Sequence, residues 1–130
     1  MSFRLSAFAP FLIAATIIFP GHYAHASDEI QHKVKLQEAL STFLDGRSDD
    51  GQITLLDQDD KKLKSVYLSS SHPMIVPLNN GNYFLCADGY DEEGNQVQMD
   101  FLVSPKDEGF LVIDAMLNAR PSVKQVVESQ

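Results

Sequence analysis

Three aspartates in the second half of the chain have the residue type and spacing that could support chemistry. Asp88, Asp100 and Asp114 each lie within a run of aromatic and aliphatic residues. Carboxylates that are close together and partly shielded from water resist ionising together, so one of them could act as an acid or a base. The same oxygens could bind a hard cation. With Tyr90 and His72, these aspartates form the candidate ligand-binding set.

The element that must position these aspartates is a hairpin over residues 82–103. Two apolar runs flank the turn sequence DEEGN, in which Gly94 suits the left-handed position of a bulged type I turn. This turn sets the register, so that one face is apolar and packs on the core while the other carries Asp88 and Asp100. The predicted pairs on the core face are Tyr83–Val103, Leu85–Phe101, Ala87–Met99 and Gly89–Val97.

A third strand over residues 110–116 continues the meander and brings Asp114 to the face of the other two aspartates. The predicted core-facing residues are Leu111, Ile113 and Ala115, and those on the aspartate face are Phe110, Val112, Asp114 and Met116. The alternative to a pocket is three solvated acids on an open sheet face, where they discourage association.

An amphipathic helix is predicted before this sheet, over residues 27–44. Its apolar residues follow helical spacing. Ile30, Val34, Leu40 and Leu44 fall near one line, with Leu36 and Phe43 beside it, and this broad face is expected to point toward the core. Ser27 is a good N-cap, and Gly46 suits the left-handed position after the last turn.

The remaining segments complete an α+β fold. Residues 52–56 and 63–69 read as a first hairpin, and residues 74–78 as a short edge strand or an extended crossover. We expect one N-terminal amphipathic helix packed on a bent antiparallel sheet of about five strands. Residues 121–130 are expected to be a C-terminal tail with at most a final helical turn.

Residues 1–26 have the features of a signal peptide. Arg4 precedes an apolar run over residues 7–19, and Ala24-His25-Ala26 provides a cleavage site before Ser27. The alternative is an uncleaved N-terminal anchor. We therefore expect a single domain over residues 27–120, a periplasmic or secreted location, and no membrane insertion after cleavage.

The charge and the cysteine count limit the partners. The net charge of −8 becomes −9 when Arg4 is removed, which disfavours nucleic acid and anionic lipid and favours basic partners or cations. Cys86 is the single cysteine, so no intramolecular disulfide can form. Its acidic neighbours raise the pKa of a thiol, which indicates a structural role.

Other motifs give no site. Residues 45–57 have a glycine spacing comparable to an EF-hand loop, but Gly46 stands at the first ligand position and Asp57 at the last, so an ordinary acidic loop is expected. His32 is interpreted as a surface residue. We find no Ser/His/Asp pattern and no phosphate-binding loop, and we assign no catalytic residue, metal site or cofactor.

One helix over residues 27–44 followed by an antiparallel meander over residues 52–117 resembles the cystatin-like and NTF2-like folds, in which a helix lies across a strongly bent sheet. The hairpin NYFLCADGYDEEGNQVQMDFLV also resembles small exported bacterial proteins of uncharacterised family. The cystatin inhibitory motif QxVxG and the several N-terminal helices of an NTF2 domain are missing, so the resemblance implies neither activity.

These observations predict a non-catalytic exported domain that binds a partner protein or a small ligand through its sheet face, which is also compatible with a homodimer. The alternative is a small enzyme or cation-binding domain that uses Asp88, Asp100 and Asp114. A third hypothesis is an inhibitor that acts through the loops at residues 70–78 and 89–96.

Overall fold

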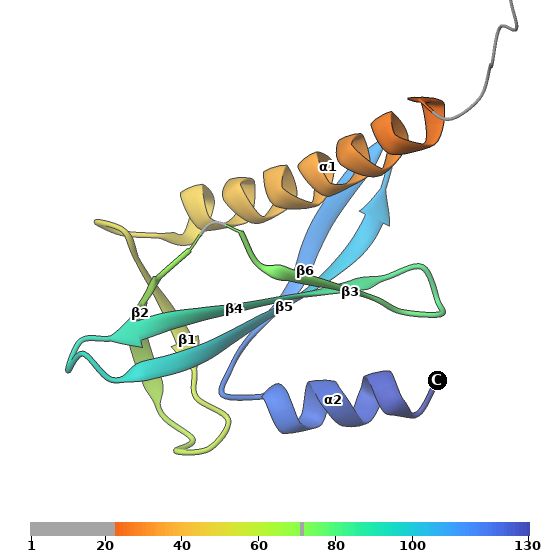
Figure 1. The fold of residues 1–130 in the computed structure, drawn as a ribbon. Helices are drawn as coiled ribbons and strands as arrows, with labels where there is room; N and C mark the ends of the chain where they lie inside the picture. Colours follow the sequence, from red (N-terminus) through yellow and green to blue (C-terminus); the bar gives the residue numbers. More distant parts are fainter. Residues whose placement is uncertain (1–22, 71) are drawn as a thin grey trace, which may run out of the picture.

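The computed structural model describes residues 23–70 and 72–130, which form two helices and six strands in an α+β arrangement. A six-stranded antiparallel sheet, one strand more than expected, lies between a long helix α1 and a short helix α2 (Figure 1). Most of the predicted signal peptide, residues 1–22, lies outside the described residues. The bounds are α1 Tyr23–Arg47, β1 Gln52–Leu56, β2 Leu63–Leu68, β3 Met74–Pro77, β4 Tyr83–Asp91, β5 Gln96–Lys106, β6 Gly109–Leu117 and α2 Arg120–Glu128.

Helix α1 begins at Tyr23 rather than at the predicted N-cap Ser27, and the face that it presents to the core is only partly the predicted one. Leu36, Ala39 and Leu40 are buried against the sheet, whereas Ile30 and Val34 are exposed, so the predicted line of contact is wrong at its N-terminal end. The contact with the sheet instead follows His32, Leu36 and Leu40, which are four residues apart, and His32 is a polar member of this line. Apolar periodicity alone does not identify such a face, because a polar residue with a partner can also be buried in it.

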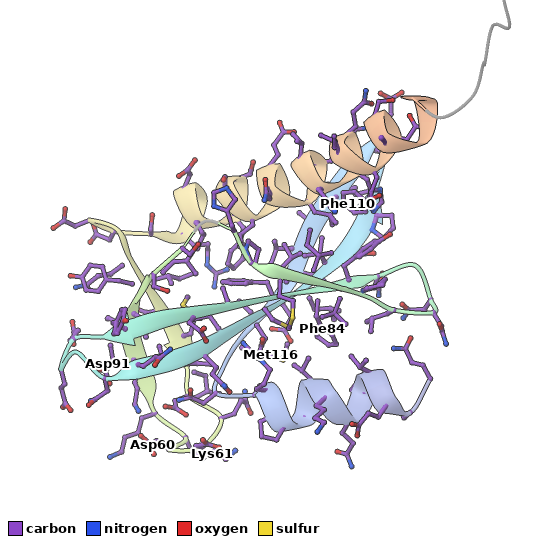
Figure 2. The ribbon with its side chains drawn as sticks, in the orientation of Figure 1. Asp60, Lys61, Phe84, Asp91, Phe110 and Met116 are labelled. Atoms are coloured by element: carbon purple, nitrogen blue, oxygen red, sulfur yellow. The ribbon has the colours of Figure 1, made fainter. Side chains whose placement is uncertain are left out.

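His32, predicted to be a surface residue, is half-buried in an aromatic cluster. Its Nε2 atom lies 2.8 Å from the hydroxyl oxygen of Tyr83, and its ring packs edge-on against Tyr83 and Phe110 at centroid distances of 5.1 and 5.0 Å. Figure 2 shows Phe110 between α1 and the strands beneath it. The cluster fixes the N-terminal half of α1 across the sheet.

The end of α1 also differs from the prediction at Gly46, which remains within the helix. The chain reverses one turn later, at Asp50 and Gly51, whose φ angles are 50° and 79°. Asp49 and Gln52 exchange both backbone hydrogen bonds at 2.9 Å around these two residues. Positive φ at both central positions is typical of a type I′ turn, for which Asp-Gly is a favoured sequence.

The sheet has the strand order β1-β2-β4-β5-β6, with β3 paired to the first part of β4. The register between β4 and β5 is the predicted one, from Tyr83 opposite Val103 to Gly89 opposite Val97. Gly94 has a φ of 82°, and its N–H donates to the carbonyl of Asp91 at 3.0 Å. The bulged turn therefore sets the register as expected.

The prediction for β6 is correct only in its second half, because a bulge interrupts the strand. Ala115 lies opposite Phe101 and Asp114 opposite Leu102, but Val112 rather than Ile113 lies opposite Val103. The extra residue reverses the sidedness of everything before it. Val112 is therefore buried in the core and Leu111 is exposed, the opposite of the prediction.

The sheet is strongly curled. β1 and β6 are at opposite ends of the strand order, yet Asp57, just after β1, forms a bridge with Leu117 at the end of β6. The N–H of Gln58 donates to the carbonyl of Leu117 at 3.0 Å. The concave side encloses one core with α1, whose buried members include Leu36, Leu40, Ile53, Leu55, Val66, Leu85, Met99, Phe101, Val103 and Leu117.

The expected C-terminal tail forms most of helix α2, which packs on the other side of the sheet (Figure 1). Val123 is buried and Val127, four residues later, packs beside it, so both lie on one face of the helix. A helix this short is marginal in water, so its apolar contacts with the sheet are what stabilise it.

Candidate functional site

The face of the sheet that points away from α1, here called the outer face, contains the predicted aspartates. Cys86 lies opposite Asp100, Asp88 opposite Gln98, and Leu102 opposite Asp114. Residues that pair directly across antiparallel strands point to the same side. The prediction that all three aspartates share one face is therefore confirmed by the register.

Helix α2 divides this outer face into two halves. The covered half consists of Phe84, Cys86, Asp100, Leu102 and Met116, which lie beneath or beside α2. Figure 2 shows Phe84 and Met116 between the sheet and this helix. The other half is called the tyrosine face and consists of Gln52, Tyr67, Asp88, Tyr90, Gln96 and Gln98.

Asp100 is fully buried in the covered half, where it pairs with Arg120 at the start of α2. The Nε atom of Arg120 lies 2.8 and 3.1 Å from the two carboxylate oxygens, and its Nη2 donates to the carbonyl of Ala87 at 3.2 Å. Burial raises the pKa of Asp100 above its usual range, although hydrogen bonds from Cys86 and Arg120 and the charge of Arg120 oppose this effect. The pair attaches α2 to the sheet.

Cys86 is buried beside this ion pair. Burial, together with the hydrogen bond to Asp100 and the negative charge of that carboxylate, raises the pKa of the thiol from 9.0 to about 12. A thiol with this pKa is almost entirely protonated at neutral pH. Its environment is that of a structural cysteine, as the sequence indicated.

The tyrosine face contains two large aromatic side chains in direct cross-strand contact positions. Tyr67 of β2 lies opposite Tyr90 of β4, and the two side chains are 41% and 47% exposed. Gln52 of β1 lies opposite Tyr67, and its Nε2 donates to the hydroxyl of Tyr67. Three strands thus place a row of glutamine, tyrosine and tyrosine side chains on one exposed surface.

A shallow hollow of about 450 Å³ adjoins this row. Gln52, Thr54 and Ser65 line it from β1 and β2, and the acidic turn before β1 contributes Asp49 and Asp50. Arg47 at the end of α1 lines its margin. The tyrosine face therefore combines aromatic surface, amide and hydroxyl groups, and carboxylates.

The other predicted site residues are placed separately. Asp88 is exposed on the tyrosine face, beside Tyr90. Asp114 is exposed on β6, where its Oδ1 accepts the N–H of Ala115 at 2.8 Å. His72 is exposed in the loop before β3, and its N–H donates to the hydroxyl of Ser70 at 3.2 Å. Of the predicted set, the tyrosine face includes Asp88 and Tyr90.

Two features of this region had no counterpart in the sequence interpretation. Tyr67 belongs to the predicted first hairpin, and nothing local predicts that β2 pairs with β4, since β3 lies between them in the sequence. Arg120 is the last residue of the predicted domain, and no role is predicted for its side chain. The available indication was Pro121, which favours the first turn of a helix, followed by Val123 and Val127 at helical spacing.

A second polar cluster, also unpredicted, closes the curled sheet. Asp57 is buried, and its carboxylate contacts Lys64 Nζ at 2.7 Å and Asn118 Nδ2 at 3.0 Å. Burial alone would raise the pKa of Asp57, but hydrogen bonds from Lys64, the backbone amides of Asp59 and Asp60, and Asn118 outweigh it and lower the pKa to about 2. These contacts join the end of β1 to the end of β6.

Across residues 23–70 and 72–130, no helix is long and apolar enough to cross a membrane. The same residues contain no group of three histidine, cysteine or acidic side chains positioned to hold a metal ion.

Comparison of the chain with protein-family models, with curated proteins and with solved structures gave no match.

Proposed function

We propose that this protein is a non-catalytic binding module that uses its tyrosine face to bind a partner protein with a cationic surface. The observation that carries the proposal is the exposed cross-strand pair of Tyr67 and Tyr90. Tyrosine supplies a large apolar area and a hydrogen-bonding hydroxyl with few rotatable bonds, and it is enriched where protein surfaces meet.

The charge distribution favours a cationic partner. The chain has a net charge of −8, and Asp88 adjoins the tyrosine pair while Asp49 and Asp50 line the neighbouring hollow. Opposite charge on a partner would accelerate its association and orient it on this face. A lysine or arginine side chain could also place its cation over a tyrosine ring.

The covered half of the outer face supports a binding role rather than a catalytic one. Both carboxylate oxygens of Asp100 contact Arg120, and the neighbouring thiol is protonated. The exposed carboxylates of Asp88 and Asp114 remain outside that cluster. On the outer face, a partner can therefore reach Asp114 and the residues of the tyrosine face.

The proposal includes an exported, periplasmic or secreted location, which rests on the sequence of residues 1–26. It also includes a cystatin-like or NTF2-like architecture. The long helix across the concave side of a curled antiparallel sheet supports this likeness.

The test is capture of partners from the envelope fraction of the source cells with the wild-type protein and a matched pair of variants. Tyr67→Ser with Tyr90→Ser removes both rings from exposed positions, so the fold should be retained and the specific partner lost. Val126→Ser, which removes an exposed apolar side chain from α2, is the control and should retain it.

Salt dependence provides the second measurement. Association of the purified partner should slow as ionic strength rises, and Asp88→Asn should slow it further at low salt. Retention of the same partner by the double tyrosine variant, with an unchanged melting temperature, would contradict the proposal.

A further inference from the structure

A groove of about 570 Å³ lies between α1 and β6, on the side of the molecule remote from α2. Ala39, Phe43 and Gly46 line it from the helix, and residues 109–112 line it from the strand. A Cβ atom built on Gly46 would have no atom within 4 Å, so the space beside this turn of the helix is open. The groove contains no residue of the tyrosine face, although Arg47 lines both the groove and the hollow beside that face.

The strand that forms one wall of the groove has a free edge. β6 is the last strand in the sheet order and pairs with β5 on one side. On its other side, within the described part of the chain, the bridge to Asp57 engages only Leu117 at the end of the strand. An unpaired edge presents backbone donors and acceptors to any extended segment that can reach them.

The two halves of β6 differ in how this edge is protected. After the bulge at Ile113, the carboxylate of Asp114 accepts a hydrogen bond from the N–H of Ala115 at 2.8 Å. Before the bulge, residues 109–113 have the sequence GFLVI, with no charged residue or proline of the kind that usually blocks pairing. Leu111 and Ile113 are 45% and 51% exposed there.

We propose that this groove is a strand-addition site for an extended segment of a partner protein. The segment would pair with residues 109–113 and have alternating apolar side chains and an acidic residue beside Arg47. Its backbone would satisfy the free edge, and its apolar side chains would enter the groove against Phe43. The site is separate from the tyrosine face and does not depend on the function proposed for that face.

The dimensions of the groove suit such a segment. Lys35 and Arg47 are the first and last helix residues that line it, and their separation of twelve positions corresponds to about 18 Å of helix. Five residues of extended chain span about 17 Å. The segment therefore needs only about as many residues as the unprotected part of β6 provides.

The charges that line the groove favour binding of an acidic segment over binding of a second copy of the chain. Lys35, Arg47 and Glu38 are the charged residues that line the groove, so its lining has a net positive charge on a molecule whose net charge is −8. Two copies of the chain repel each other, whereas an acidic residue on the added strand would meet the guanidinium of Arg47.

The experiment is a titration of the ¹⁵N-labelled protein with synthetic peptides, in which binding is measured from the changes in amide chemical shifts. The probe is an acetylated peptide, Asp-Val-Thr-Val-Thr-Val, and two controls replace its aspartate by lysine or methylate alternate backbone nitrogens. We expect saturable shifts at residues 109–113 and on the C-terminal half of α1. The lysine peptide should bind at least tenfold more weakly, and the methylated peptide should not bind.

Variants of the protein provide the matched comparison. Gly46→Leu should fill the groove and abolish the shifts, because this position is helical and has open space for a side chain. Arg47→Glu should weaken binding of the aspartate peptide at least tenfold. Ile30→Ala, which changes an exposed residue of α1 outside the groove, should leave binding unchanged.

Three results would overturn the proposal. The first is no shift at millimolar peptide, and the second is shifts confined to residues near Tyr67 and Tyr90. The third is a concentration-dependent dimer, seen by sedimentation, that Gly46→Leu abolishes; in that case the groove would be an interface between two copies. Failure here would leave the tyrosine-face proposal standing, since that proposal is tested with other variants.

Discussion

The two halves of the outer face provide a controlled comparison within one sheet. Asp88 and Asp100 are on paired strands and point to the same side, yet Asp88 is exposed and Asp100 is fully buried against Arg120. Tyr90 and Phe84, on the same face of the same strand, differ in the same way. The strands are continuous across both halves, and α2 covers only the half that contains Asp100 and Phe84.

This comparison shows that the register of a sheet determines which residues share a face but not what covers that face. A carboxylate beneath α2 becomes part of a packed interface, whereas one beyond its end is available to a partner. The predictions below test whether α2 alone makes this difference, from the largest expected effect to the smallest.

The first prediction concerns access to the covered half. At pH 8, native Cys86 should react with iodoacetamide about a thousandfold more slowly than a free thiol, because a pKa raised from 9.0 to about 12 reduces the thiolate fraction by that factor. The measurement is the rate of mass increase with and without denaturant. A native rate close to the denatured rate would mean that α2 does not shield this half.

The second prediction removes the attachment of α2. Arg120→Ala should lower the free energy of unfolding by about 3 kcal/mol, because it leaves Asp100 buried without its partner. Urea denaturation measures the change. Lys124→Ala on the same helix is the control, and it should change stability by less than about 0.5 kcal/mol because its pairing with Glu128 is exposed. Equal effects of the two variants would show that the buried pair does not hold α2.

The third prediction tests how β2 and β4 come together to form the tyrosine face. A Cβ atom on Gly89 would lie 2.4 Å from the carbonyl oxygen of Tyr67 and 2.7 Å from Met99 Sδ. Gly89→Ala should therefore destabilise the protein by about 2 kcal/mol, as overpacking does, and separate Tyr67 from Tyr90.

The control for this variant is Gly46→Ala, at a helical position with open space. It should raise the free energy of unfolding by about 0.5 to 1 kcal/mol, because alanine favours the helix more than glycine. Thermal or urea denaturation of both variants measures the contrast. A neutral Gly89→Ala would mean that β2 and β4 do not require their close approach.

The fourth prediction compares the buried carboxylates by pH. The pKa of Asp57 is lowered from 3.8 to about 2, so the unfolded chain binds more protons than the folded protein between these values. The stability that this group contributes is present above pH 4 and is lost as the pH falls towards 2. In Asp57→Asn, the free energy of unfolding should fall by about 1 to 2 kcal/mol less than in the wild-type protein over this pH range. This value is smaller than the full pKa shift implies, because Lys64 is partly exposed to solvent.

Asp100 should show the opposite dependence, since burial raises its pKa. The folded protein then holds a proton that the unfolded chain has released, so this group makes the protein less stable as the pH rises above about 4. Asp100→Asn should therefore steepen the loss of stability on acidification, whereas Asp57→Asn flattens it. Chemical denaturation between pH 2 and 7 measures the slope of each variant relative to the wild-type protein, and changes of slope in the same direction would contradict the comparison.

Much of the outer face could be predicted from the sequence, because its determinants are local. Gly94 tolerates the left-handed conformation that the bulged turn requires, and that single turn sets eight cross-strand pairs. The first hairpin was predicted for a similar reason. By contrast, the bulge at Ile113 could not be read from FLVI, because a continuous apolar run has no period that distinguishes one face from the other.

The sequence by itself determined that Asp88, Asp100 and Tyr90 share a face, since alternation along a strand leaves no choice once the turn is placed. Only the tertiary structure decided that α2 lies over Asp100 and that Tyr67 stands beside Tyr90. Both depend on pairing and packing between segments distant in the chain. A helix as short as α2 is stable only when packed, so its own sequence does not specify where it lies.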